Sequence, residues 1–186
     1  MAQTSNIEAT PTIVGARVRL VPFGPSHMTP AYVAWLNDPA VVRYSEQRHR
    51  RHTLESCNAY FEAMRDGGHH FWAIERTDFG AARHIGNLGA TMDRPNKVAD
   101  LAIMIGDREA QGRGLGRDAW ISACEWAIGP GGARKASAGT MAENLPMLRL
   151  FELAGMTIEA VRKGHFILDG RPIDAIYAAR FSPQHR

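Results

Sequence analysis

A glycine-rich turn in the second half of the sequence has the residue types needed to bind an anionic group. The apolar run Ile103-Met104-Ile105 precedes it, and the turn reads Gln111-x-x-Gly114-x-Gly116 before a helix-forming segment. A strand, a turn and a helix in this order leave free backbone N–H groups at the helix N-terminus, where the helix dipole favours anions. Glycine has no Cβ, so the backbone can approach a phosphate closely. The pattern predicts a phosphate-binding turn, although a tight strand-to-helix connection without a ligand could use the same glycines.

Three phosphate-binding patterns can be compared with this turn. The P-loop pattern ends in Gly-Lys-Ser/Thr, and the turn contains no lysine. The dinucleotide-binding pattern G-x-G-x-x-G/A would use Gly112 and Gly114 but then meets Arg117, and it belongs in an early βαβ unit. The remaining pattern, Q/R-x-x-G-x-G/A, agrees at Gln111, Gly114 and Gly116. It is similar to the turn with which the GNAT superfamily of N-acetyltransferases holds the pyrophosphate of coenzyme A.

A second motif follows the turn in the order that this superfamily would show. Apolar residues recur at helical spacing from Leu115 to Ala127, and a short strand is predicted from about Arg134 to Thr140. Asn144 is predicted to cap the next helix, which ends at a glycine. The spacing Asn-x6-Phe-x3-Gly-Met in residues 144–156 resembles the second signature of the superfamily. The resemblance covers roughly residues 98–156 with two ordered motifs, and an N-terminal segment described below extends it.

The resemblance implies acetyl-CoA as co-substrate and points to the residues that would bind it. In the superfamily the strand before the turn diverges from its neighbour, and its backbone pairs with the pantetheine arm. One backbone N–H there can meet the thioester oxygen. Core packing of the isoleucine side chains is compatible with this role, because backbone and side chain serve different partners. The implied cofactor-binding residues are Ile103, Met104, Ile105, Gln111, Gly112, Arg113, Gly114, Leu115, Gly116, Arg117 and Asn144, although Asn144 could equally serve only as a helix cap.

Acetyl transfer needs a base that removes the ammonium proton, and relatives often carry a carboxylate on the strand before the turn. Asp100 matches that position, within the otherwise apolar run Val98–Ala102, where an unpaired charge is costly to bury. An exposed or salt-bridged Asp100 without a catalytic role is the alternative, and Glu75 is another candidate base. Many relatives place a tyrosine as general acid where this chain has Phe151, which cannot donate a proton. Tyr177 is the predicted substitute, although a thiol of pKa about 8.5 can leave as thiolate without an acid.

The acceptor is expected to meet the segment between the first two predicted helices. Residues 35–44, Trp-Leu-Asn-Asp-Pro-Ala-Val-Val-Arg-Tyr, resemble a motif of the branch that includes ribosomal-protein N-terminal and bacterial amino-sugar acetyltransferases. Residues 45–53 are rich in arginine and histidine, which would suit a phosphorylated acceptor such as a nucleotide-linked amino sugar, but a solvated basic loop has the same composition. We expect a small-molecule primary amine, with a protein N-terminus as the alternative. The predicted substrate-binding residues are Trp35, Asn37, Arg43, Tyr44 and Arg48.

Two other functional classes are compatible with parts of the sequence. A nucleic-acid-binding protein could use residues 43–52 as a basic arm and would bind in a strongly salt-dependent way. A non-catalytic CoA-binding module would keep the turn but lack a working base. The formal net charge is only +3, which does not by itself indicate a nucleic-acid partner. The cysteines and histidines show no metal-ligand spacing. We therefore expect an N-acetyltransferase with no nucleic-acid partner and no metal.

Length and composition indicate one globular domain. The chain has 186 residues, of which 45% are hydrophobic. No apolar run is long enough to span a membrane and the N-terminus lacks the core of a signal peptide, so we expect a cytoplasmic protein, as a monomer or homodimer. Residues 1–12 are predicted to form a flexible tail and residues 13–182 the N-acetyltransferase domain. Cys57 and Cys124 are expected to be reduced.

The order of predicted elements is β-α-α-β-β-β-α-β-α-β-β. Helices are predicted at Ser26–Asn37 and after Thr53, which has the features of an N-cap. Two long strands, Thr157–Leu168 and Pro172–Phe181, are predicted to form a hairpin through Asp169-Gly170. This is the order of elements in the acyl-CoA N-acyltransferase fold, which the resemblance implies for this chain. It is an α/β (α+β) single domain with a mixed central sheet of about seven strands and helices on both faces.

Overall fold

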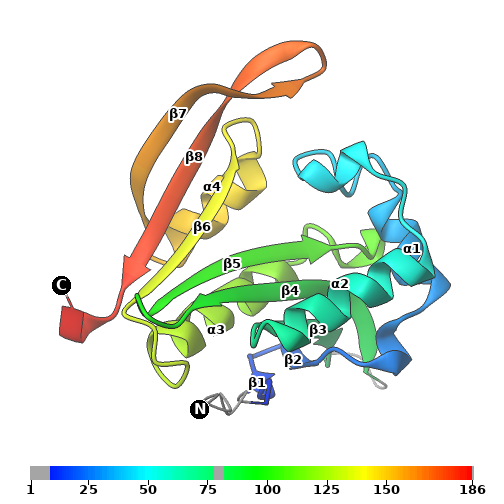
Figure 1. Ribbon diagram of the computed structural model, residues 1–186, viewed down its shortest axis with the longest axis horizontal. Helices are drawn as coiled ribbons and strands as arrows, with labels where there is room; N and C mark the ends of the chain where they lie inside the picture. Colours follow the sequence, from blue (N-terminus) through cyan, green and yellow to red (C-terminus); the bar gives the residue numbers. More distant parts are fainter. Residues whose placement is uncertain (1–8, 78–81, 186) are drawn as a thin grey trace, which may run out of the picture.

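A computed structural model describes residues 9–77 and 82–185, which form a mixed sheet flanked by helices (Figure 1). Eight strands are hydrogen-bonded in the order β1-β2-β3-β4-β5-β6-β8-β7. The predicted single-domain fold is confirmed, and the strand beyond the expected seven is the very short β1. The strands are β1 Ile13–Val14, β2 Val18–Pro22, β3 His70–Arg76, β4 Arg83–Asp93, β5 Val98–Ile105, β6 Lys135–Met141, β7 Thr157–Leu168 and β8 Arg171–Phe181. The α-helices are α1 Pro30–Leu36, α2 Leu54–Asp66, α3 Leu115–Ile128 and α4 Leu145–Leu153.

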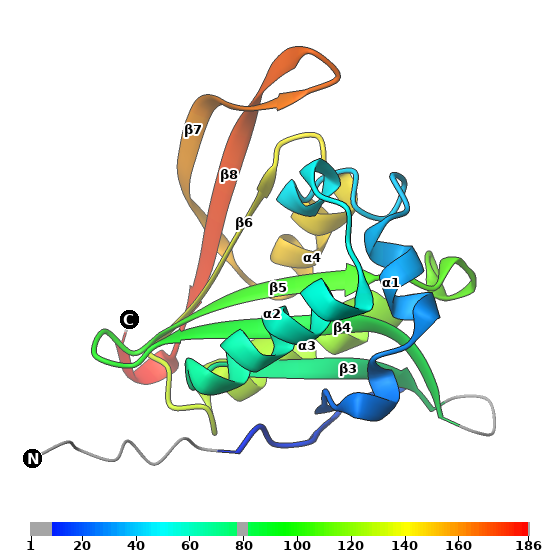
Figure 2. The same cartoon turned by 45° about the vertical axis from the view of Figure 1, so that its right-hand side comes forward.

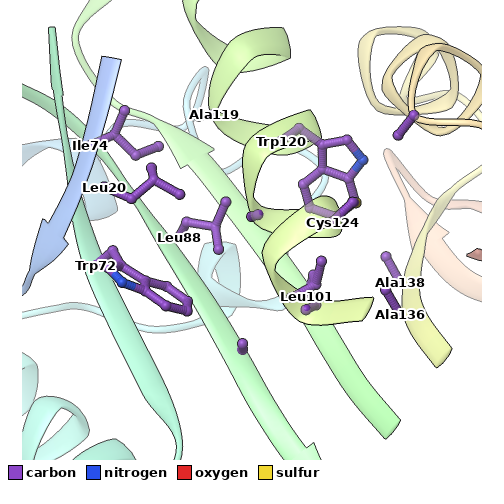
Figure 3. Packing of buried hydrophobic residues seen from close by; sticks show 14 of the residues in the cluster. Leu20, Trp72, Ile74, Leu88, Leu101, Ala119, Trp120, Cys124, Ala136 and Ala138 are labelled. Atoms are coloured by element: carbon purple, nitrogen blue, oxygen red, sulfur yellow. The ribbon is translucent and has the colours of Figure 1, made fainter. Parts of the chain in front are cut away.

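Helices cover both faces of the sheet, as predicted (Figures 1 and 2). On one face α2 packs against β3, with α1 beside it, and on the other face α3 packs against β1, β2, β5 and β6, with α4 beside α3. The main hydrophobic core lies between α3 and the sheet, where Trp72, Leu88 and Trp120 are completely buried (Figure 3). Within the described residues, no helix has the length and apolar character needed to cross a membrane.

The sheet opens between β5 and β6. These two strands pair in parallel only at Val98–Asp100 with Lys135–Ser137. Beyond these pairs the strands diverge, while β5 stays paired with β4 on its other side and β6 with β8 (Figure 1). The opening is therefore V-shaped, with its closed end at Asp100 and Ser137 and its wide end toward Ile105.

The predicted helix Ser26–Asn37 is wrong in its first turn. Pro25–His27 forms a 3-10 turn, and α1 begins at Pro30. Thr29 is its N-cap, and the threonine Oγ1 accepts a hydrogen bond from the backbone N–H of Tyr32. A proline has no N–H and forces the residue before it into an extended conformation, so a helix can begin at Pro30 but cannot run through it.

Two local predictions from turn and cap chemistry are confirmed. Thr53 caps α2, because its Oγ1 accepts a hydrogen bond from the backbone N–H of Ser56. Asp169 and Gly170 both have positive φ, 51° and 75°, as the favoured two-residue hairpin turn requires. Cys57 and Cys124 are buried and free, as expected.

Part of the predicted tail lies against the sheet. Residues 1–8 fall outside the described residues. Trp72 Nε1 donates a 2.6 Å hydrogen bond to the carbonyl of Pro11, and His70 Nδ1 lies 3.3 Å from Thr10 Oγ1. Residues 10 and 11 therefore contact β3.

Candidate active site

The glycine-rich turn links the end of β5 to the start of α3. Gln111 Nε2 donates a 2.9 Å hydrogen bond to the carbonyl of Ile105, which fastens the turn to the strand. Gly112 and Gly114 have φ of 71° and 79°, a left-handed conformation that favours glycine. Gly114 is the N-cap of α3. The predicted strand–turn–helix geometry is confirmed. Glycine occupies both left-handed positions, because a residue with a Cβ would be strained at these φ values.

The first turn of α3 leaves several backbone donors without helical partners. The first hydrogen bond into the helix runs from the N–H of Asp118 to the carbonyl of Gly114. The N–H groups of Leu115, Gly116 and Arg117 precede it and have no acceptor one turn earlier in the helix. A Cβ on Gly116 would lie 3.2 Å from Ile105 Cγ1, so glycine allows α3 to start close to β5. The turn thus presents amide donors at a positive helix end, directly after the diverging strand.

Basic side chains lie beside this turn. Arg17 donates a 2.8 Å hydrogen bond to the carbonyl of Arg113, which ties the start of β2 to the turn. Arg17 also lines a hollow of about 240 Å³ together with Ala16, Gly114, Arg117, Asp118, Ile121 and Leu153. The carboxylate of Asp118 accepts hydrogen bonds from three backbone N–H groups, those of Ala16, Arg17 and Val18. The Asp118 carboxylate is occupied by these backbone N–H groups. Arg17 and Arg117 are therefore the lining side chains that suit an anionic ligand in the hollow.

Strand β5 offers an open backbone edge to the V-shaped opening. The predicted cofactor segment Ile103–Ile105 lies beyond the last pair with β6, so its edge facing β6 has no strand partner among the described residues. Ile103 and Ile105 pack against the core under α3, whereas Met104 packs on the opposite face near α1. Side-chain packing and a free backbone edge therefore coexist, as the sequence suggested.

Asp100 lies at the closed end of the opening. Strand alternation places Ala99 and Leu101 in the core, so Asp100 points to the opposite face. Its Oδ1 accepts a 3.0 Å hydrogen bond from Ser137 Oγ. Burial by the surrounding protein raises the pKa of the carboxyl although the residue retains solvent exposure, and the Ser137 hydrogen bond opposes that shift. A carboxylate with a raised pKa is a better proton acceptor.

Tyr177 lies on the same face as Asp100, across the opening. It pairs with Gly139 of β6, two residues beyond Ser137, and a Cβ on Gly139 would lie 2.9 Å from the tyrosine ring. The absence of a side chain at Gly139 leaves room for the ring beside β6. The Arg162 guanidinium of β7 stacks over the ring, 4.8 Å from its centroid. The fold therefore brings both predicted catalytic residues to one face of the sheet.

Glu75, the alternative base, is engaged elsewhere. Its carboxylate accepts a 3.0 Å hydrogen bond from Arg19 and lies 3.4 Å from His27 Nε2. It is on β3, which β4 separates from β5 in the sheet. The geometry therefore favours Asp100.

Asn144 caps α4 as predicted. Its Oδ1 accepts a hydrogen bond from the N–H of Met147, and its Nδ2 donates to Thr140 Oγ1. Both ends of the amide are used within the chain, which accounts for this asparagine without a cofactor.

Two of the predicted substrate-binding residues anchor the segment between α1 and α2, hereafter the α1–α2 segment (residues 37–53). Asn37 lies at its start and forms a two-way clamp with His52 near its end, through Nδ2 to the His52 carbonyl and Oδ1 from the His52 N–H, each 2.9 Å. The Trp35 ring lies against Gly106, where any Cβ would overlap it. These contacts fix the segment against the end of β5.

The other three predicted substrate-binding residues connect this segment to the β7–β8 hairpin. Arg43 pairs with Asp169 at 2.6 Å, and Arg48 donates to the Ile167 carbonyl at 3.1 Å. Tyr44 packs against the small cluster formed by Met141, Leu168 and Ile173. Both arginines thus have partners within the chain, and the segment spans from the β5 side of the opening to the β8 side. Contact of these residues with an acceptor stays a prediction.

No sequence pattern indicated Ser137, which contacts Asp100, or Tyr60 on α2, which lies over β4, the strand next to β5. Tyr60 is 45% exposed, and its hydroxyl lies 3.8 Å from the position of a Cβ on Gly89, the β4 partner of Ala102. Both residues lie in elements that the sequence predicted, but their positions beside β5 and β4 depend on contacts between distant segments. Among the described residues, no group of three or more histidine, cysteine or acidic side chains could hold a metal ion.

Comparisons with known proteins agree with this fold. A spermidine N-acetyltransferase from Vibrio cholerae, solved in complex with CoA and spermine, has a TM-score of 0.79 and 17% identity over 91% of this chain and 98% of that chain. A GNAT-family acetyltransferase from Bacillus anthracis has a TM-score of 0.77 and 15% identity over 92% and 99%. A ribosomal-protein-alanine N-acetyltransferase from Brucella melitensis has a TM-score of 0.72 and 19% identity over 87% and 98%. No curated protein sequence matches the chain.

The family follows from a sequence comparison. At these identities the solved structures establish a shared fold. A family model described as an acetyltransferase (GNAT) domain matches residues 17–157, which include the turn, the opening and the α1–α2 segment. The chain therefore belongs to the GNAT acetyltransferases, enzymes that act on amine acceptors.

Proposed function

We propose that this protein transfers the acetyl group of acetyl-CoA to the primary amine of a small molecule. The observation that carries the proposal is the V-shaped opening between β5 and β6, which leads directly to the left-handed glycine turn. An extended ligand with a phosphate group at one end suits this combination, because the turn supplies amide donors and the open edge of β5 supplies further backbone groups. CoA is such a ligand, and the Vibrio cholerae neighbour is described in complex with it.

Different groups in and around the turn would bind different parts of acetyl-CoA. The N–H groups of residues 115–117 would meet the pyrophosphate, and Arg17 and Arg117 would add positive charge beside it. The free edge of Ile103–Ile105 would pair with the amides of the pantetheine arm. A backbone N–H of this edge would also stabilise the negative charge that develops on the thioester oxygen.

Asp100 and Tyr177 are the proposed proton-transfer residues. Asp100 would take the proton from the acceptor ammonium, and its raised pKa suits a base that must accept a proton. The free amine would then attack the thioester carbon, the sulfur would leave with the bonding electron pair, and the second proton of the nitrogen would be released to solvent as the amide forms. Tyr177 lies across the opening and would donate a proton to that thiolate. Its contribution should be small, because the thiolate of a thiol with pKa about 8.5 is stable enough to leave unprotonated.

A small acceptor is favoured by the contacts of the α1–α2 segment. Through Arg43, Tyr44 and Arg48 this segment touches the β7–β8 hairpin. It would thereby restrict access to the opening from that side. Arg50 and Arg51 of the same segment remain exposed and could meet acceptor phosphates, which makes nucleotide-linked amino sugars the first candidates. A protein N-terminus is the second candidate, because the Brucella melitensis neighbour is a ribosomal-protein-alanine acetyltransferase.

A CoA-release assay with a panel of acceptors tests this proposal. The panel contains amino sugars, nucleotide-linked amino sugars, aminoglycosides, polyamines and peptides with free N-termini. We expect CoA release with at least one small amine, and loss of that release in Asp100→Asn. CoA binding without release on any amine would instead indicate a non-catalytic module. Salt-dependent nucleic-acid binding with no CoA binding would refute the proposal altogether.

A further inference from the structure

Ser137 takes no part in the proposed transfer itself, yet its side chain is hydrogen-bonded to the proposed base. Its Oγ donates to Asp100 Oδ1 at 3.0 Å. The two residues are 37 positions apart in the sequence and belong to different strands, β6 and β5. Their contact therefore exists only because of the way the sheet is assembled.

The position of this contact within the sheet is specific. Asp100 and Ser137 form the last of the three residue pairs that join β5 to β6. Beyond them the strands diverge into the opening where the thioester would lie. Alternation turns both side chains away from the core under α3, where the neighbouring alanines Ala99 and Ala136 are buried. The hydrogen bond thus lies at the closed end of the opening, on its solvent-accessible face.

The hydrogen bond uses only one of the two carboxylate oxygens. Among the residues that the structure describes, Asp100 Oδ2 receives no hydrogen bond and forms no ion pair. A carboxylate has about four acceptor sites, so engagement of Oδ1 leaves the other oxygen able to take a proton. The serine hydroxyl has a single proton, which it commits to Oδ1.

We propose that Ser137 is a positioning residue, which holds the Asp100 carboxylate through Oδ1 so that Oδ2 accepts the proton of the acceptor amine. This inference rests on the proposed role of Asp100 as base. In the step, the ammonium passes one proton to Oδ2, and the free amine forms the C–N bond as the C–S bond breaks with its electrons on sulfur. The second proton of the nitrogen is released to solvent as the amide forms. Ser137 keeps its own proton throughout.

Few charged groups are placed to shift the pKa of the Asp100 carboxyl. Lys135, on the same face of β6, pairs with Glu159 of β7 at 2.6 Å, so the two charges offset each other. Arg162 lies over the Tyr177 ring, and Tyr60 of α2 contributes a neutral phenol. Burial and the Ser137 hydrogen bond are the causes that act on the pKa of Asp100. Because that hydrogen bond stabilises the ionised carboxylate, its loss should raise the pKa further.

Ser137→Ala is the test, carried out with the full-length chain. Carbon-13 NMR of the aspartate carboxyls, with Asp100→Asn used to identify the signal, should show that Asp100 titrates at higher pH in Ser137→Ala. The acid limb of the kcat/KM profile for the best amine of the panel should move in the same direction. At a fixed pH on that limb we expect a loss of roughly tenfold, as one hydrogen bond to a charged group implies. The high-pH plateau should also fall, because the carboxylate is no longer held in place, whereas the affinity for acetyl-CoA should be retained.

Two further variants serve as controls. Ser137→Thr keeps the hydroxyl and should restore the wild-type profile. Thr91 of β4 lies directly opposite Asp100 on the other neighbouring strand, but no hydrogen bond between the two is observed. Thr91→Val, which removes this hydroxyl, should therefore leave both the Asp100 titration and the rate profile unchanged. An Asp100 titration that does not move in Ser137→Ala would overturn the inference. A titration that moves while the rate profile stays fixed would overturn the positioning role and the assignment of Asp100 as base, but not acetyl transfer itself. Failure of the proposed function would appear separately, as no CoA release by the wild-type protein.

Discussion

Replacement of Gly114 by alanine separates backbone strain from ligand binding at the turn. Gly114 has φ of 79°, and a Cβ built on it would meet only Arg17 Nη1, at an ordinary contact distance of 3.9 Å. The cost to the folded protein is therefore the left-handed conformation alone, about 1–2 kcal/mol. For a chain of this size that corresponds to a decrease in Tm of roughly 2–8 °C.

The affinity for CoA should fall as well. The backbone strain does not cause this fall, because it is the same in the free and the CoA-bound protein. The new methyl group would occupy space needed by a phosphate that approaches the N–H groups of α3. Loss of one hydrogen bond to a charged group is about 1.5–3 kcal/mol, or roughly 10- to 100-fold in Kd. Isothermal titration calorimetry with CoA measures the affinity, and differential scanning fluorimetry measures Tm. The larger Gly114→Trp should abolish binding.

Gly132→Ala is the matched control. Gly132 has φ of 69° with no atom within 4 Å of its would-be Cβ, and it lies in the connection between α3 and β6, after the C-terminal end of α3. It should show the same decrease in Tm with unchanged CoA affinity. Equal CoA affinity in wild type, Gly114→Ala and Gly132→Ala would refute the assignment of the turn as the pyrophosphate site.

Three further outcomes follow from the geometry. Asp100→Asn should lower kcat about a hundredfold or more with unchanged calorimetric affinity for CoA, and an unchanged pH–rate profile would exclude Asp100 as the base. Asn37→Ala removes the clamp to His52 and should cost about 1–2 kcal/mol of unfolding free energy, measured by urea denaturation; no loss would contradict an anchoring role. Burial, with the nearby charge of His27, lowers the pKa of His84 from 6.5 to about 4. As the pH falls from about 6.5 toward 4, the unfolded chain therefore binds a proton before the folded protein does, and stability is lost by up to about 3 kcal/mol. Urea denaturation across that range should show this loss in the wild type and a weaker one in His84→Gln, and identical curves would argue against His84.

Residues of the predicted acceptor motif make structural contacts within the chain. Residues 35–44 resemble a motif from a branch of acetyltransferases in which this region faces the acceptor. In this structure Asn37 and Trp35 anchor the segment, while Arg43 and Arg48 bind the β7–β8 hairpin. The same residues therefore account for the position of a wall of the opening. Any direct contact with an acceptor would come in addition to these structural contacts.

The sequence by itself determined the features that depend on a few consecutive residues. The left-handed glycines of the turn, the caps at Thr53 and Asn144, and the hairpin at Asp169-Gly170 are set by φ preferences and by hydrogen bonds that span a few positions. The first turn of the predicted helix Ser26–Asn37 failed for an equally local reason, because Pro30 limits where a helix can start. Family motifs built on such local geometry can be found without a structure.

Tertiary structure alone decided which distant residues meet. The register of β5 against β6 places Ser137 on Asp100, and a shift of one residue would have pointed one of these side chains into the core. The contacts of Arg43 with Asp169 and of Arg48 with Ile167 join residues 126 and 119 positions apart. No local preference encodes these pairs, because they arise from the packing of whole strands and segments. The turn that would bind the donor was therefore visible in the sequence, whereas the surroundings of the base and the wall toward the acceptor depend on the fold.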